Sequence, residues 1–164
     1  MKLQSSAFVH GSSIPKQQTG EGQDVSPPLV WEDVPDATKS FALIGDDPDA
    51  PSAKRPAPQP WVHWVIFNIP GDSRSLPAGI ARASKLATPA GACQGHNSWP
   101  SDNVGYLGPM PPNGSGPHRY FFKLYALDDR LSLAPAQANK QTLLDAMRGH
   151  VLAEAELMGT YERA

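Results

Sequence analysis

Three short clusters of residues in this sequence are able to bind or transform a small molecule. The first, Asp46 to Pro51, places three carboxylates after an apolar run and stiffens the backbone with two prolines. The second is Trp61-Val62-His63-Trp64, a histidine among aromatic residues. The third, Gly105 to Tyr120, is a glycine- and proline-rich segment that ends in His-Arg-Tyr. Each also has an ordinary structural explanation: a solvated turn, a core histidine and a connecting loop.

Considered together, these clusters indicate an anion-binding site. Side chains alternate along a strand, so His63 faces the side of Trp61, and His118 faces the side of Tyr120. If the strand ends that carry them meet Asp47, two imidazoles, a phenol and loop N–H groups share one pocket. A carboxylate fits there if it keeps a histidine cationic, or if it accepts a hydrogen bond from a ligand hydroxyl, protonated phosphate or amine.

The elements that must position these residues are predicted to be mainly β-strands. Apolar, β-branched and aromatic runs bounded by proline and glycine predict strands over 8–10, 29–31, 40–45, 61–69 and 118–127. The run over 61–69 is apolar on both faces, which predicts a central strand. Strict alternation places Trp61, His63, Val65, Phe67 and Ile69 on one face, and Val62, Trp64 and Ile66 on the other.

A single helix is predicted near the C-terminus. Asn139 is a suitable N-cap, and Gly159 a suitable residue after the helix end, with Gly149 inside the helix. We expect a loop over 86–116 and one domain over 1–164. The predicted fold is mainly β (α+β), an antiparallel β-sandwich-like domain with a C-terminal helix. The apolar residues at helical spacing are Leu143, Met147, Val151, Ala155 and Met158.

Composition excludes several classes of protein. The 18 prolines and 14 glycines among 164 residues argue against a helical bundle. A net charge of −2, from 14 basic and 16 acidic residues, argues against a nucleic-acid binder. The single cysteine, Cys93, excludes an internal disulfide and a thiolate metal cluster. Neither a secretory signal nor a membrane-spanning stretch is recognisable, so we expect a soluble, cytoplasmic protein without stable membrane insertion.

Two enzymatic alternatives stay open. A hydrolase would use Asp47 with His63 or His118, but the sequence has no Gly-x-Ser-x-Gly motif and marks out no serine as nucleophile. A metal-dependent enzyme would use the same three residues as a two-histidine-one-carboxylate set, without any local metal-binding spacing. A purely structural or interaction protein is the third alternative. We predict a binding protein rather than an enzyme, with no cofactor and no metal.

The order of these motifs resembles the phosphatidylethanolamine-binding protein family. The resemblance rests on Asp47 to Pro51, Trp61 to Trp64 and Gly108 to Tyr120. The segments Ser26 to Trp31 and Glu156 to Tyr161 are similar to its bacterial Raf-kinase-inhibitor-like branch. The resemblance extends over nearly the whole chain, from residue 8 to residue 161.

The resemblance implies a surface pocket for phosphate or carboxylate anions, including the phosphoethanolamine head group. It also implies a kinase or another signalling protein as partner, and a homodimer. His63 and His118 are expected to donate hydrogen bonds to the anion, so that binding strengthens as the pH falls toward about 6. Met110 departs from the cysteine that bacterial relatives often carry. The implied ligand-binding residues are Asp47, Trp61, His63, Gly108, Pro111, His118 and Tyr120.

Overall fold

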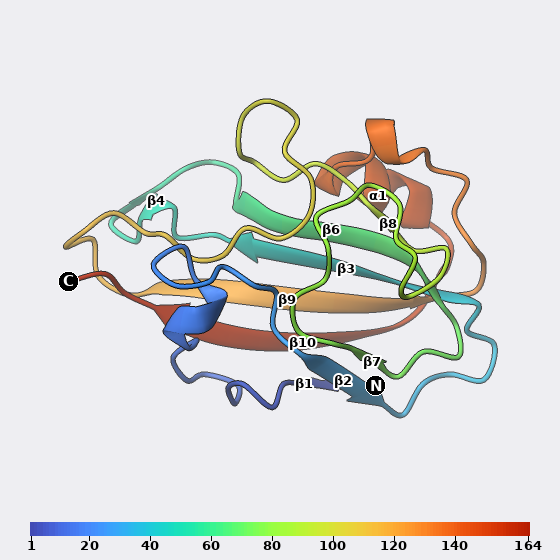
Figure 1. The fold of residues 1–164 in the computed structure, drawn as a ribbon. Coiled ribbons are helices and arrows are strands. Elements are labelled where there is room, and N and C mark those ends of the chain that lie inside the picture. The colour runs from blue at the N-terminus through green and yellow to red at the C-terminus, as the bar shows by residue number, and fades with distance from the viewer.

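A five-stranded antiparallel sheet forms the centre of the computed structural model, which covers residues 1–164 (Figure 1). Its strands lie in the order β10-β9-β3-β6-β8. The two central strands, β3 and β6, are buried over nearly their whole length, as the apolar character of both their faces predicts. The strands are β3 (Ser40–Asp47), β6 (Trp61–Pro70), β8 (Cys93–Gln94), β9 (His118–Leu127) and β10 (Val151–Tyr161).

Smaller elements cover both faces of this sheet. A three-stranded sheet of order β1-β2-β7 lies on one side, and the helix α1 (Lys140–Met147) lies on the other (Figure 1). None of the helices has the length and hydrophobicity that a membrane crossing requires. The remaining elements are β1 (Lys2–Gln4), β2 (Leu29–Glu32), β7 (Ser75–Leu76), the hairpin of β4 (Pro51–Ser52) and β5 (Arg55–Pro56), and the 3₁₀ turns η1 (Lys16–Gln18) and η2 (Pro135–Gln137).

The hydrophobic core is divided in two by the five-stranded sheet. Successive side chains of β3 point to opposite faces, so Phe41 and Leu43 join a cluster of 20 buried residues beneath the small sheet. Ala42 and Ile44 join a cluster of 10 buried residues beneath α1. The mainly β, antiparallel architecture predicted from the sequence is confirmed.

Bulges in β6 make the predicted division of its faces wrong. Gly45 pairs with Trp64 and Asp46 with Val62, so His63 is an extra residue without a partner on β3. A bulge shifts the alternation by one residue and redirects the side chains beside it. As a result His63 and Trp64 both lie toward the larger core. Behind the bulge, Ile66 packs in the larger cluster, and Val62, Val65 and Phe67 pack with the smaller one.

A second irregularity follows farther along β6. Phe41 pairs with Ile69 and Leu43 with Ile66, which leaves two residues of β6 opposite one of β3. Asn68, inside this bulge, has a positive φ of 54°. The bulge returns Ile69 to the larger cluster, on the face opposite to Phe67, so its predicted place beside Phe67 is also wrong.

The helix near the C-terminus is confirmed, but it is shorter than predicted. Asn139 caps it and exchanges side-chain hydrogen bonds with Thr142. The helix ends at Met147, and Gly149 reverses the chain with a φ of +84° instead of lying inside a helix. The chain then continues as β10, because its backbone pairs with β9 over almost its whole length. The helical spacing of the apolar residues after 147 was coincidental.

Two other predicted segments can be compared with the structure. Residues 8–10 are irregular and lead into a turn at His10 instead of forming a strand, although Phe8 is buried and packs against Phe122. The predicted loop over 86–116 is irregular except for the two-residue strand β8 and isolated bridges. This loop therefore takes its shape from tertiary contacts.

A substitution in β10 tests the packing of the larger core. A Cβ added at Gly159 would lie 2.6 Å from Ile14 Cγ1 and 2.8 Å from Phe8 Cε2, and both side chains are buried. We expect Gly159→Ala to lower the free energy of unfolding by about 1–3 kcal/mol through overpacking. Urea denaturation followed by tryptophan fluorescence measures the loss.

The matched control is Gly45→Ala in β3. The atoms nearest to its added Cβ lie at 3.5 Å, an ordinary contact distance. We expect a change below about 1 kcal/mol. Equal effects of the two substitutions would contradict the packing described for Gly159.

Candidate functional site

A cavity of about 440 Å³ opens where β3 ends and where β6 and β9 begin. The three ends meet because β3 lies between the other two strands and runs antiparallel to both. Six of the seven predicted ligand-binding residues line this cavity, and Gly108 does not. The lining residues are Asp47, Ala50, Pro51, Ala57, Gln59, Trp61, His63, Trp99, Met110, Pro111, Pro112, His118 and Tyr120.

A buried contact between an imidazole and a carboxylate forms the base of the cavity. The Nδ1 atom of His118 lies 2.8 Å from Oδ2 of Asp47, and the two side chains are 1% and 3% exposed. The backbone N–H of Asp49 donates to the other carboxylate oxygen at 2.7 Å. Burial raises the pKa of Asp47, while the hydrogen bonds from His118 and Asp49 oppose that shift. Both oxygens of the carboxylate are therefore held in place.

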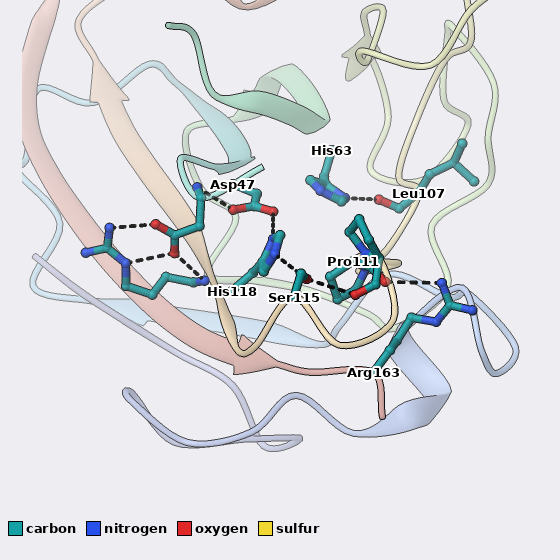
Figure 2. Close-up of polar contacts among 10 residues, drawn as sticks. Asp47, His63, Leu107, Pro111, Ser115, His118 and Arg163 are labelled. Carbon is teal, nitrogen blue, oxygen red and sulfur yellow. Dashed lines mark hydrogen bonds and ion pairs between the residues drawn. The ribbon is translucent and has the colours of Figure 1, made fainter. Parts of the chain in front are cut away.

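The second ring nitrogen of His118 also has a protein partner. Its Nε2 lies 3.0 Å from the hydroxyl oxygen of Ser115, which in turn lies 2.8 Å from the carbonyl oxygen of Pro112 (Figure 2). Direct donation by His118 to an anion, predicted from the sequence, therefore requires the ligand to replace Ser115 on Nε2.

His63 is oriented as a hydrogen-bond acceptor. Its Nδ1 lies 2.6 Å from the carbonyl oxygen of Leu107 (Figure 2), and a carbonyl only accepts, so this nitrogen carries the proton. Burial lowers the pKa of His63 to about 4, so the ring is neutral at physiological pH. The neutral ring presents an unprotonated Nε2 to the cavity, so the predicted donation from His63 to an anion, and the pH dependence built on it, are wrong for this residue.

Groups other than His63 supply the hydrogen-bond donors of the cavity. Burial and the nearby Asp47 raise the pKa of Tyr120, so its phenol stays protonated. The backbone N–H of Met110 makes no hydrogen bond within the chain. No lysine or arginine lines the cavity. The site thus offers neutral donors beside two acceptors, His63 and the Asp47 carboxylate.

The rim of the cavity is held by segments distant in sequence. Arg163 donates to the carbonyl oxygen of Pro111 at 3.1 Å (Figure 2), and Gly114 N–H donates to Arg163 O at 3.2 Å. Gly108 N–H donates to Asp24 Oδ1 at 2.7 Å, so it is not free for a ligand. A Cβ at Gly108 would lie 2.1 Å from Gln18 O, so this glycine allows two backbone segments to approach.

Sequence reasoning missed several residues of this region, of which Trp99 and Ser115 make the most informative contacts. Trp99 lies in the long loop and packs edge-on against Trp61 and His63, with ring centroids 5.4 and 5.0 Å apart. Ser115 touches His118 although it lies in a segment that reads as a plain glycine-rich loop. The sequence offers only a tryptophan inside a long loop and a serine between two glycines. Neither pattern identifies the residues that these side chains contact.

The metal-binding set considered from the sequence is not assembled. No three histidine, cysteine, aspartate or glutamate side chains converge closely enough to hold a metal ion. The Asp47 carboxylate is hydrogen-bonded to His118, and Nδ1 of His63 is hydrogen-bonded to the backbone carbonyl of Leu107. The three residues share the cavity wall without forming a common coordination site.

Comparison with known proteins gives consistent matches along the chain. Residues 4–162 match the sequence profile of the phosphatidylethanolamine-binding protein family. A UPF0098 protein of Methanothermobacter thermautotrophicus is 51% identical over 163 residues, covering 99% of both chains. A phosphatidylethanolamine-binding protein homologue of Chlamydia trachomatis is 40% identical, with a TM-score of 0.84 over 99% of this chain and 97% of that one. YbcL of E. coli is 32% identical, with a TM-score of 0.86 over 99% and 98%.

The ion pair next to the cavity predicts a pH-dependent stability. Arg119 donates to both carboxylate oxygens of Asp49 at 2.9–3.0 Å, from backbone and side chain, and thereby lowers the pKa of Asp49. A lowered folded-state pKa stabilises the protein above the unfolded value of about 3.9, and this contribution is lost as the pH falls through the folded value. We expect Asp49→Asn to cost on the order of 1–3 kcal/mol at pH 7.

Urea denaturation at pH 7 and pH 3 checks this prediction, since the difference from wild type should shrink at the lower pH. Asp145→Asn is the control, because its pair with Arg148 is exposed and should contribute less than about 1 kcal/mol. A difference for Asp49→Asn that does not change with pH would contradict the assigned ion pair.

The tautomer of His63 is directly observable. We expect ¹⁵N chemical shifts at pH 6 and above to show a neutral ring with the proton on Nδ1, because burial keeps the pKa near 4 and Leu107 accepts from that nitrogen. A long-range ¹H–¹⁵N correlation spectrum measures both nitrogens. A cationic His63 at pH 6 would refute its role as acceptor.

Proposed function

The chain belongs to the phosphatidylethanolamine-binding protein family, and on that premise we propose that it binds small anions of the phosphate-monoester type. The observation that carries the proposal is the balance of groups in the cavity. Tyr120 O–H and Met110 N–H are donors for the anion oxygens, whereas His63 Nε2 and the Asp47 carboxylate are acceptors. Such a set suits a ligand that carries its own proton donor.

Phosphoethanolamine and singly protonated phosphate esters fit this description. Their oxygens accept from Tyr120 and Met110, and their ammonium or P–OH group donates to His63 or Asp47. A fully deprotonated anion would place its charge beside the Asp47 carboxylate without a fixed cation nearby. The site therefore discriminates by protonation state rather than by attraction to a cationic residue.

Aromatic side chains provide the remaining contact surface. Trp61 is 38% exposed at the cavity mouth and packs edge-on against Trp99. Their faces suit an alkyl or alkylammonium group attached to the anion. With a net charge of −2 the protein exerts no long-range attraction on anions, so the affinity for a free ligand should be modest. A kinase or other signalling protein that presents a phosphorylated group would be modulated through this same cavity.

Removal of one hydroxyl tests the proposed binding mode. Tyr120→Phe keeps the ring and removes the donor. We expect the affinity for phosphoethanolamine to fall about 10- to 100-fold, because a hydrogen bond to a charged group contributes about 1.5–3 kcal/mol. Isothermal titration calorimetry at pH 7 measures the change.

Tyr125→Phe is the matched control on the same strand. Tyr125 packs in the smaller core on the opposite face of the sheet and should not affect binding. Amide shift perturbations at 47–49, 110–116 and 120 identify the bound site by NMR. Equal affinity of the wild type and Tyr120→Phe would refute the proposed donor, and shifts elsewhere would refute the site.

A further inference from the structure

Ser115, His118 and Asp47 are arranged as a nucleophile, its base and the group that orients the base. The Ser115 hydroxyl lies 3.0 Å from His118 Nε2, and His118 Nδ1 lies 2.8 Å from Asp47 Oδ2 (Figure 2). Both distances fall within the 2.6–3.2 Å range expected of an activated serine. Such a triad is recognised by geometry and not by sequence position.

The acid of this triad is held through both of its carboxylate oxygens. Asp49 N–H donates to Asp47 Oδ1, which directs Oδ2 toward the imidazole. When the neutral ring of His118 carries its proton on Nδ1, that proton binds the carboxylate and the lone pair of Nε2 faces the serine. This is the tautomer that general-base catalysis needs.

Ser115 is positioned where a substrate can reach it. The residue is half-buried between Gly114 and Gly116, which have φ angles of 74° and 81°. Apart from the neighbouring residues in the chain, a Cβ added at either glycine would meet no heavy atom within 4 Å, so no other segment packs against the loop at these two positions. The backbone N–H of Gly116, directly after the serine, makes no hydrogen bond within the chain and is free to bind an oxyanion.

The hydroxyl proton has two acceptors. Pro112 O lies at 2.8 Å and His118 Nε2 at 3.0 Å from Ser115 Oγ. Rotation about the Cβ–Oγ bond alone moves the proton from the carbonyl to the imidazole. No movement of the loop is needed to produce the reactive arrangement.

We propose that these three residues hydrolyse short carboxylic esters, an activity beyond the proposed anion binding. Ser115 Oγ attacks the ester carbonyl carbon while its proton passes to His118 Nε2. The carbonyl–alkoxy bond then breaks, and His118 returns the proton to the departing alcohol. Water adds to the acyl-serine, giving its proton to Nε2, and the acid leaves as Ser115 regains that proton.

The cavity determines the class of ester. Ser115 does not itself line the 440 Å³ cavity, but its two contacts, Pro112 and His118, do. We therefore expect a substrate that reaches Ser115 to extend into this cavity. Its walls include Trp61 and Trp99 and carry no lysine or arginine. Small, uncharged alkyl or aryl esters suit this surface better than anionic or long-chain ones.

A serine-reactive phosphonofluoridate and p-nitrophenyl acetate test the proposal with the full chain. We expect intact-mass and peptide mass spectrometry to find one phosphonate adduct, on Ser115. Ser115→Ala should lose the adduct, and its kcat/KM for the ester should fall at least about 100-fold. Ser84→Ala is the control, because this exposed serine makes no side-chain hydrogen bond and should behave as wild type.

Phosphoethanolamine titration of Ser115→Ala distinguishes this proposal from the proposed function. Retained shift perturbations together with lost hydrolysis support a separate catalytic role for Ser115. If the wild type takes up no phosphonate, or if Ser115→Ala hydrolyses the ester at the wild-type rate, the catalytic proposal is overturned. Anion binding is unaffected by either result, and its own failure would show in the titration of the wild type.

Discussion

The buried contact between Asp47 and His118 is the constraint on which the site depends. A carboxylate that is 3% exposed is costly to bury unless its oxygens are hydrogen-bonded. His118 and the Asp49 N–H meet that requirement, and Asp49 is itself held by Arg119. The start of β9 is thereby tied to the end of β3 at the base of the cavity, which fixes where the neighbouring groups lie.

The topology of the sheet places this contact at the base of a pocket. Because β3 is central and antiparallel to both neighbours, its last residues face the first residues of β6 and β9. The bulge in β6 then turns His63 toward Leu107, so the long loop closes over the cavity. Arg163 secures the rim from the end of the chain. Elements from the whole length of the sequence therefore contribute to one small site.

The cavity differs from anion-binding sites that are built from positively charged side chains. A neutral His63, a protonated Tyr120 and an occupied His118 leave no positive side chain free to face a ligand. Selectivity arises from matching donors and acceptors, which is strong only for ligands that satisfy both. The same occupied His118 places a hydroxyl against a base, and the proposed ester hydrolysis depends on this contact.

The convergence of Asp47, Trp61, His63, His118 and Tyr120 was an expectation that depends on β3 lying antiparallel between β6 and β9, and the tertiary structure decides that arrangement. The sequence by itself determined the apolar strands β2, β3, β6 and β9, because the hydrophobic period is a local property. It did not determine the end of α1, where pairing with β9 outweighed helical spacing. Nor did it determine the tautomer of His63 or the contact of Ser115. Those depend on which carbonyl or imidazole a distant segment brings within 3 Å, and only tertiary packing decides that.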